Sequence, residues 1–260
     1  MQQALRTTRR AAAAQLGALI RSLAGDAGYL GKENWAGREA WLERNLAQIP
    51  AGQRILDAGA GELQYKRFCK HLNYISQDFG QYNGQGDGRG FQMDLWDNSR
   101  LDLVGDIAAL PLAEASFDAI MCVEVLEHVP APVEALREMT RLLRPGGLLL
   151  ITAPFCALTH FAPYFYQTGY TRYFYEHWLA QLGYTIDELQ PNGSYFAYMA
   201  QELRRLDGVS RSYAGRRLGF GERLLVHRVL RLLGQLAAHD SGSSELLAYG
   251  MLVRARRLAL

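Results

Sequence analysis

Residues 54–62 read Arg-Ile-Leu-Asp-Ala-Gly-Ala-Gly-Glu, and this stretch decides the fold of the 260-residue chain. An apolar run that ends in an acid and two closely spaced glycines predicts a buried strand, a turn, and then a helix over about residues 62–71. Glycine has no Cβ, so the turn lets a small molecule approach the backbone. Ligands of an open parallel sheet bind at the carboxyl ends of its strands, which places Asp57 beside such a ligand.

The same stretch has two other interpretations. A dinucleotide-binding loop would follow the pattern G-x-G-x-x-G, but Gly59 and Gly61 are followed by Gln64 where the third glycine should be. Glu62 would also bring negative charge to the N-terminus of the next helix, where a pyrophosphate would lie. The turn therefore suits a cationic or zwitterionic ligand better than a phosphate. An ordinary strand–turn–helix corner without any ligand remains the alternative.

Composition limits the class of protein. Hydrophobic residues make up 49% of the chain and charged residues 21%, so a substantial core is expected and global disorder is excluded. The net charge of +2 argues against a general nucleic-acid binder. Cys69, Cys122 and Cys156 are far apart and lack metal-ligand spacing, which favours reduced thiols in a cytoplasmic protein and predicts no metal site. No apolar run is long enough to span a bilayer.

Strand and helix signals alternate from residue 54 to about residue 155. We predict strands at 54–57, 73–78, 101–107, 117–123 and 148–152, and helices at 35–49, 62–71 and 132–143. This alternation favours a parallel sheet with helices on both faces. Further on we expect a helix at 173–182, a strand at 183–189, helices at 195–206 and 222–238, and a last strand at 246–256.

The predicted domain organisation has two parts. Residues 1–50 form a helical N-terminal extension, because the apolar segment after the first arginines is too short, and too soon interrupted by Gln15 and Arg21, for a signal peptide. Residues 51–260 form the main domain, with residues 194–240 as a helical insert before the last strand. The basic amphipathic helix at 222–238 can lie on a membrane surface, but we favour packing on the sheet or on a second subunit of a homodimer.

Acids end the second and third predicted strands as well as the first. Asp78 lies about 20 residues beyond the glycine turn, the spacing at which a carboxylate takes ribose hydroxyls in nucleotide-binding units. The alternative for Asp78 is a strand-end acid that caps a turn. Asp106 ends the third strand, and the five-glycine segment at 80–100 between these strands is interpreted as a lid or an ordered insert.

Together these motifs resemble the class I S-adenosylmethionine-dependent methyltransferases, most closely the small-molecule branch called type 11. The resemblance covers residues 55–155 and rests on Asp-x-Gly-x-Gly at 57–61, Asp78, Gly-Asp-Ile at 105–107, Phe-Asp-Ala-Ile at 117–120, Glu-Val-Leu-Glu-His at 124–128 and Leu-Leu-Arg-Pro-Gly-Gly at 142–147. It implies a Rossmann-like, seven-stranded, mostly parallel sheet whose last strand is antiparallel. It also implies S-adenosylmethionine as the cofactor.

By this resemblance, the glycine turn and the strand ends contact the methyl donor. The turn and the first acid would hold the methionine part, the second acid the ribose, the third acid and its neighbour the adenine, and the residues after the fourth strand the transferred methyl. The residues so assigned are Asp57, Gly59, Gly61, Asp78, Phe79, Asp106, Ile107, Val123 and Glu124.

The acceptor side is expected in residues 160–173, which follow the fifth strand and carry many aromatic side chains. If the acceptor is a hydroxyl, a base must take its proton, and histidine has the most suitable pKa near neutrality. His160 is the first candidate base and His128 the second, although either can instead brace the local structure. Substrate contacts are predicted for Tyr164, Tyr170, Arg172 and Tyr173, with packing as the alternative.

The sequence therefore predicts an enzyme that methylates a small polar or ring-bearing acceptor, such as a sugar or polysaccharide precursor or a secondary metabolite. Direct transfer to oxygen is favoured over transfer to nitrogen, and nucleic acid is not expected as a partner. Two alternatives remain open: a non-catalytic donor-binding scaffold subunit and a protein methyltransferase.

Overall fold

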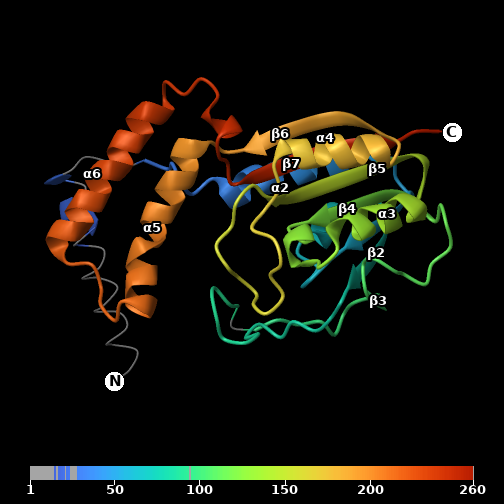
Figure 1. Ribbon diagram of the computed structural model, residues 1–260, viewed down its shortest axis with the longest axis horizontal. Coiled ribbons are helices and arrows are strands. Elements are labelled where there is room, and N and C mark those ends of the chain that lie inside the picture. The colour runs from blue at the N-terminus through green and yellow to red at the C-terminus, as the bar shows by residue number, and fades with distance from the viewer. Residues whose placement is uncertain (1–14, 16, 21, 24–27, 94, 260) are drawn as a thin grey trace. The chain divides into compact units, whose positions relative to one another are not determined.

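The computed structural model describes residues 15, 17–20, 22–23, 28–93 and 95–259 (Figure 1). The chain divides into two compact units. A sheet unit comprises residues 36–192 and 248–260, and a helical unit comprises residues 1–35 and 193–247. Within the predicted helical N-terminal extension at 1–50, the described residues between 15 and 23 are helical and residues 28–33 form bends and a turn. Its first 14 residues lie outside the described part of the chain.

Seven strands form one sheet in the order β3-β2-β1-β4-β5-β7-β6. Their bounds are β1 Arg54–Ala58, β2 Asn73–Asp78, β3 Leu103–Val104, β4 Phe117–Val123, β5 Leu143–Pro154, β6 Tyr184–Asn192 and β7 Gly250–Arg257. Strands β1 to β5 pair in parallel, and β7 lies antiparallel between β5 and β6. The predicted Rossmann-like, mostly parallel sheet with an antiparallel last strand is confirmed.

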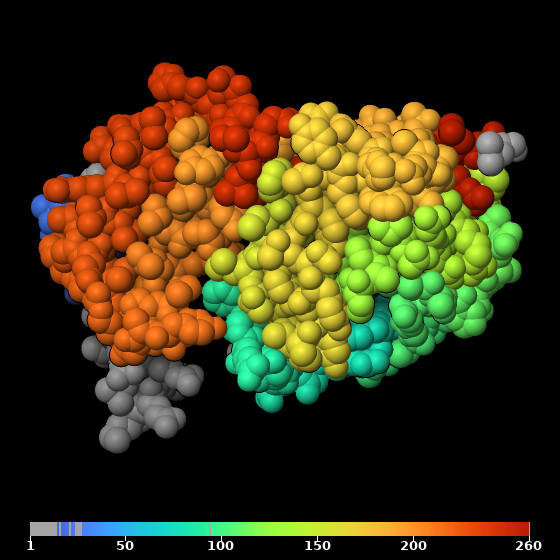
Figure 2. Space-filling model, in the orientation of Figure 1, coloured from blue at the N-terminus to red at the C-terminus, as the bar shows by residue number. Residues whose placement is uncertain are grey.

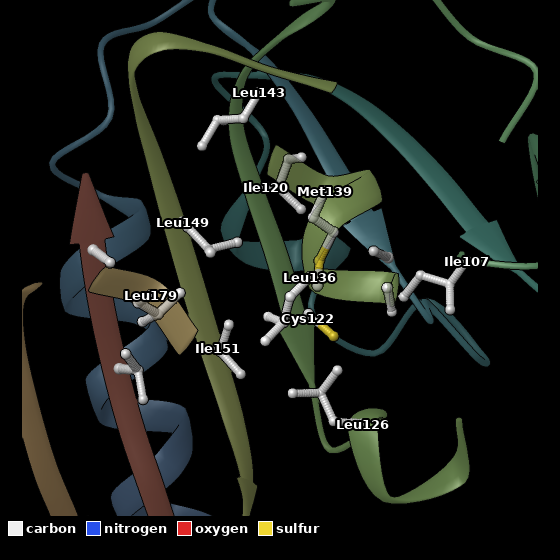
Figure 3. Packing of buried hydrophobic residues seen from close by; sticks show 14 of the residues in the cluster. Ile107, Ile120, Cys122, Leu126, Leu136, Met139, Leu143, Leu149, Ile151 and Leu179 are labelled. Atoms are coloured by element: carbon white, nitrogen blue, oxygen red, sulfur yellow. The ribbon is translucent and has the colours of Figure 1, made fainter. Parts of the chain in front are cut away.

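Both faces of the sheet are buried, because alternate residues of the central strand β4 pack in opposite directions. Ile120 and Cys122 face the helices α3, Pro132–Leu142, and α4, Arg172–Gln181, which supply Leu136 and Leu179 to the same cluster (Figure 3). Met121 and its alternate neighbours face α2, Asn34–Leu46, on the other side. Stacked layers of helix, sheet and helix hold the carboxyl ends of β1, β2, β3 and β4 along one edge (Figure 1).

Several predicted bounds are wrong. The helix expected at 62–71 is replaced by turns and a single 3-10 turn, η1, at Lys66–Phe68, because Gly61 and Leu63 both adopt left-handed φ values that no α-helix accepts. The strand expected at 101–107 shortens to Leu103–Val104. The fifth strand begins at Leu143 rather than residue 148, since Leu143 already pairs with Phe117 ahead of a bulge.

The last strand also begins later than predicted. Residues 243–245 form a 3-10 turn, η3 at Ser243–Glu245, and β7 starts only at Gly250. A second 3-10 turn, η2 at Leu126–His128, follows β4 and carries one of the candidate histidines.

The helical unit is built from α5, Tyr195–Tyr213, and α6, Phe220–Ala237. They match the two helices predicted there, although α5 ends later than predicted and α6 begins two residues earlier and ends one residue earlier. Ser194 caps α5 by accepting from the backbone N–H of Ala197 at 3.5 Å. The small core of this unit centres on Ala200 and Leu230. Within the described residues, none of the helices combines the length and the apolar character that crossing a bilayer requires.

Candidate functional site

The glycine turn after β1 leaves no room for larger side chains. The backbone N–H groups of Gly59 and Ala60 both donate to the carbonyl of Gln77 at 2.8 Å, which ties the turn to the end of β2. Gly59 and Gly61 have φ values of +85° and +51°, where side chains are strained. A Cβ on Gly59 would lie 2.3 Å from the Val125 side chain. Glycine is therefore required at this corner, because the backbone is left-handed and because Val125 leaves no room for a Cβ.

A Cβ on Gly61 would likewise lie 2.6 Å from the ring of Trp96. Trp96 belongs to the loop at residues 80–100, so this loop closes over the glycine turn. The lid or ordered insert expected in this segment thus lies against the predicted donor site.

Two buried carboxylates lie under and beside the turn. Asp78 accepts from the backbone N–H of Gly61 at 3.1 Å and from that of Gly80 at 2.9 Å. Burial raises the pKa of Asp78, while these backbone hydrogen bonds oppose the rise. Asp57 accepts from the hydroxyl of Tyr74 at 2.5 Å. Burial raises the pKa of Asp57 to about 7, against the opposing effect of the Tyr74 hydrogen bond.

The end of β3 brings the residues predicted to contact the adenine to the same edge. The backbone N–H of Gly105 donates to the carbonyl of Asp78 at 3.0 Å, which places Asp106 next to the end of β2. Asp106 is exposed and accepts from the backbone N–H of Ala108 at 2.9 Å, whereas Ile107 is buried in the core. The Phe79 ring packs edge-on against the ring of Tyr164 at 4.9 Å.

Glu124 leaves β4 in a left-handed conformation with φ of +56°. Its carboxylate accepts from the Thr152 hydroxyl at 2.8 Å and forms an ion pair with Arg38 at 2.8 Å, and it follows the buried Val123. Of the four non-glycine residues with positive φ in the described chain, Leu63, Glu124 and Phe161 follow strands β1, β4 and β5. Such strain persists where surrounding contacts enforce it, and it concentrates at functional sites.

Glu127 is buried between the two candidate histidines. Its side chain is 0% exposed, and neither carboxylate oxygen has a hydrogen-bond partner among the described residues. The Nε2 atoms of His128 and His160 lie 3.8 and 3.9 Å from its Oε1. Burial raises the pKa of Glu127 well above its usual range, with the charge of Glu124 as the next cause. Burial, together with the His160 ring, lowers the pKa of His128 to about 4.

Both histidines are oriented by backbone carbonyls. Nδ1 of His128 lies 2.5 Å from the carbonyl oxygen of Tyr164, and Nδ1 of His160 lies 2.9 Å from that of Leu158. A carbonyl oxygen can only accept, so Nδ1 of each ring donates its proton there. The two rings meet edge to face at a centroid distance of 4.7 Å. The structure therefore brings the two predicted base candidates together around one acid.

Aromatic side chains from two loops surround this cluster. Phe161 stacks on Tyr82 at 4.5 Å and on His128 at 5.2 Å, and Phe165 packs against His160 at 4.9 Å. The loop at 80–100 and the segment at 155–170, which we call the strap, are joined by backbone hydrogen bonds between Phe91 and residues 159 and 161, at 3.0 and 2.9 Å. Figure 2 shows the strap, in yellow, directly against the loop, in teal.

The predicted substrate residues separate into two groups. Tyr164 lies at the site, where its ring contacts Phe79. Tyr170 is buried in the core, and its hydroxyl donates to the carbonyl of Leu126 at 2.7 Å. Arg172 pairs with Glu176 at 2.8 Å on α4, and Tyr173 is 69% exposed on the same helix. Only Tyr164 is thus placed beside the histidine cluster, whereas Tyr170 has a packing role.

Glu127 and Trp96 were not predicted as site residues. Glu127 stands inside the Glu-Val-Leu-Glu-His motif, so the signal was present as a second acid three residues after Glu124. No sequence signal distinguishes Trp96 from the other aromatic residues of its loop, because its contact with Gly61 depends on the path of a long irregular segment.

A protein-family model matches part of the sheet unit. Residues 56–151 match a family model described as a methyltransferase domain. Over 156 residues the chain is 33% identical to the demethylmenaquinone methyltransferase of Renibacterium salmoninarum, and the match covers 59% of this chain and 60% of that protein. A 53-residue segment is 47% identical to the ubiquinone biosynthesis O-methyltransferase of Xanthomonas oryzae pv. oryzae, covering 20% of this chain and 21% of that protein.

A solved structure extends the likeness over most of the chain. The [4+2]-cyclase SpnF matches with a TM-score of 0.53 and 21% identity, covering 88% of this chain and 84% of that one. At this identity the likeness concerns the fold alone. The curated relatives described above are matched over less than two thirds of their own length.

Proposed function

Because the chain carries a domain of the S-adenosylmethionine-dependent methyltransferase family, we propose that it transfers the methyl group of this donor to a hydroxyl of a small polar or ring-bearing acceptor. One observation carries the proposal. The glycine turn and the acids of β1, β2 and β3 lie at the same sheet edge as two histidines, Glu127 and an aromatic wall. The residues that would bind the methyl donor thus lie next to those that would bind the acceptor.

The residues of the donor side fit S-adenosylmethionine. A backbone corner that accepts no Cβ at Gly59 suits the close passage of the methionine part. Asp78 and Asp106 offer carboxylates to the ribose hydroxyls and the adenine amino group, and Phe79 and Ile107 provide apolar surface beside them. Asp57 lies under the turn and would stabilise the ammonium group of the donor. When bound, the donor supplies an electrophilic methyl group on a sulfonium.

The chain's own contribution is mainly alignment of the two reactants. A hydroxyl oxygen attacks the methyl carbon as the carbon–sulfur bond breaks, and the bonding pair stays on sulfur. Holding both partners in line can supply about 7–11 kcal/mol of the barrier. The positive charge on sulfur falls during transfer, so an unpaired carboxylate nearby would stabilise the ground state more than the transition state. Glu124 avoids this because it is paired with Arg38 at 2.8 Å, and we assign it a positioning role.

The acceptor must lose a proton, and His160 is our candidate to take it. Its Nδ1–H donates to a backbone carbonyl, so its Nε2 carries the lone pair. His128 is held more deeply and its pKa is lowered to about 4, so it is the weaker base. The name of the Xanthomonas relative, an O-methyltransferase, supports oxygen as the accepting atom.

Two variants test the proposal. Asp78→Ala should abolish binding of S-adenosylhomocysteine in a calorimetric titration, because it removes the ribose contact and loosens the glycine turn. His160→Ala should retain that binding but lower turnover by about 100-fold or more on a panel of phenols, quinols and sugars, since general base catalysis typically contributes 10²–10⁴-fold. Unchanged turnover in His160→Ala would remove it as the base.

A non-catalytic donor-binding subunit is the second candidate. The fold of this chain is shared with a protein described as a cyclase, and a fold does not specify a reaction. Tight donor binding without methylation of any acceptor class, together with a stable partner protein, would favour this role. Methylation of a protein substrate instead would favour a protein methyltransferase.

A further inference from the structure

Glu127 is a buried acid whose carboxylate is not stabilised by hydrogen bonds from the described residues. A carboxylate that is 0% exposed and has no hydrogen-bond partner among the described residues is costly, because burial without compensation disfavours its charged form. Other buried acids at this edge are satisfied: Asp78 accepts two backbone N–H groups, and Asp57 accepts a tyrosine hydroxyl. Glu127 therefore differs from them in having an acceptor capacity that the chain itself leaves unused.

The side chains that face Glu127 offer lone pairs. Nδ1 of His128 and Nδ1 of His160 both donate to backbone carbonyls, so Nε2 is the acceptor atom of each neutral ring. Both Nε2 atoms lie near the same carboxylate, at 3.8 and 3.9 Å from Oε1. Three groups that can each donate an electron pair to a cation thus converge.

We propose that Glu127, His128 and His160 bind one divalent first-row transition cation, such as Mn²⁺ or Zn²⁺. The three candidate ligand atoms all lie within 4.8 Å of one another. Three ligands at about 2.1 Å from one ion lie about 3.4–3.6 Å from one another, so the two distances to Glu127 have to close by roughly 0.2–0.5 Å. The remaining separation has to close by no more than about 1.4 Å. This proposal differs from the sequence-based prediction of no metal site.

The surroundings have the form of a metal site. Histidine ligands usually donate their second N–H to a carbonyl or carboxylate, which fixes the tautomer and the ring orientation, and both histidines do so here. Two imidazoles and one carboxylate suit Zn²⁺, Mn²⁺ or Fe²⁺ better than Mg²⁺ or Ca²⁺, which prefer oxygen ligands. Three protein ligands leave coordination positions open for an acceptor.

This inference deepens the proposed function and rests on it for its purpose. A hydroxyl of the acceptor bound to the cation would have a lowered pKa and would lose its proton to solvent water. The resulting oxygen would attack the donor methyl, and the bonding pair of the carbon–sulfur bond would remain on sulfur. His160 would then act as a ligand, and the cation would take over the task assigned to the histidine in the metal-free chain. Acceptors with two neighbouring oxygens, such as catechols or sugar diols, would be preferred.

Cation binding can be measured without any acceptor. The full chain, stripped with EDTA and dialysed, is titrated with MnCl₂ and with ZnCl₂ by calorimetry, and with CoCl₂ by visible absorption. We expect one cation per chain and a Co²⁺ spectrum typical of mixed nitrogen and oxygen ligands. Glu127→Gln, which keeps the side-chain volume, and His160→Asn should each lower the affinity at least 10-fold. His177→Ala removes an exposed histidine of α4 and should leave the affinity unchanged.

Each outcome decides the inference. No binding of any of the three cations up to millimolar concentration would overturn it, and so would wild-type affinity in folded Glu127→Gln. Circular dichroism melts of each variant identify any that fail to fold, and His160→Asn provides the second measurement in that case. The same samples are titrated with S-adenosylhomocysteine. Donor binding without cation binding refutes this inference alone, whereas cation binding without donor binding refutes the proposed function but supports the cation site.

Discussion

The two halves of the sheet edge differ in whether their buried acids accept hydrogen bonds. In the donor half, formed by the ends of β1, β2 and β3, the carboxylates of Asp57 and Asp78 accept hydrogen bonds from nearby groups of the chain. In the acceptor half, formed by η2 and the strap, Glu127 faces two histidine nitrogens and accepts no hydrogen bond among the described residues. The donor half is complete before any ligand arrives, whereas the acceptor half needs a proton or a cation.

This difference has a physical consequence. Hydrogen bonds to a buried carboxylate offset its desolvation, so the donor half can be rigid and preorganised in the empty protein. In the acceptor half, the desolvation of the Glu127 carboxylate is not offset by hydrogen bonds, and binding of a proton or a cation would offset it. Perturbation of the first half should therefore impair donor binding, and perturbation of the second should affect stability and chemistry but leave donor binding intact.

The largest expected effect concerns the pH dependence of stability. The pKa of Asp57 is near 3.8 in the unfolded chain and about 7 in the folded one, because burial disfavours its charged form. The contribution of protonated Asp57 to the free energy of unfolding is fully present below about pH 4. It is lost as the pH rises to 7, by up to roughly 4 kcal/mol for a pKa difference of about three. Urea unfolding at pH 4 to 8 should show that wild type loses stability relative to Asp57→Asn over this range. Parallel curves for the two proteins would contradict the account.

The second effect concerns the glycine corner. Gly59→Ala introduces a Cβ that would lie 2.3 Å from the Val125 side chain in a left-handed residue, and we expect at least a 100-fold loss of affinity for S-adenosylhomocysteine, about 2.7 kcal/mol. Gly52→Ala is the matched control. It has a similar φ of +81°, has nothing within 4 Å of a Cβ, and precedes β1 at the opposite end of the strand.

Both glycine variants should lose about 1–2 kcal/mol of stability through backbone strain, because a left-handed conformation costs that much for a residue with a Cβ. Only Gly59→Ala should lose donor binding. Equal donor affinity in the two variants would show that the corner after β1 does not hold the donor.

The smallest effect lies in the acceptor half. Glu127→Gln replaces an unpartnered buried acid by a neutral amide of the same shape, so the metal-free variant should be about 1–3 kcal/mol more stable than wild type at pH 8. Thermal melts in EDTA measure this difference. The matched change in the donor half, Asp78→Asn, should be destabilising, since Asp78 accepts two backbone N–H groups. Destabilisation by both substitutions would remove the contrast between the halves.

The sequence predicted the sheet better than its loops, for a physical reason. A central strand such as β4 is apolar throughout because both of its faces are buried, and its bounds were predicted correctly at Phe117–Val123. The helix predicted after the glycine turn was wrong, because Gly61 and Leu63 adopt left-handed conformations that the local composition does not reveal. Local periodicity reports burial, but it does not report backbone conformation within an irregular turn.

The candidate site shows the same division. The acids at the ends of β1, β2 and β3 follow from motif spacing, and the structure brings them to one edge. The pairing of His128 with His160 around Glu127 joins residues 32 positions apart through the path of the strap, and no spacing rule encodes it. Tyr170 and Tyr173 were predicted beside the substrate from the position of their segment after the fifth strand and from its aromatic content. One faces the core and the other is exposed on α4, because a tyrosine-rich segment does not reveal which side chains turn inward.

A crystal structure of the chain with S-adenosylhomocysteine tests the central claim most directly. We expect the ligand to cross the glycine corner at residues 59–61, with its ribose on Asp78, its adenine between Phe79 and Ile107, and its sulfur directed toward the side of the edge that carries Glu127 and His160. Ligand density anywhere else, or crystals that remain ligand-free at millimolar concentration, would contradict it.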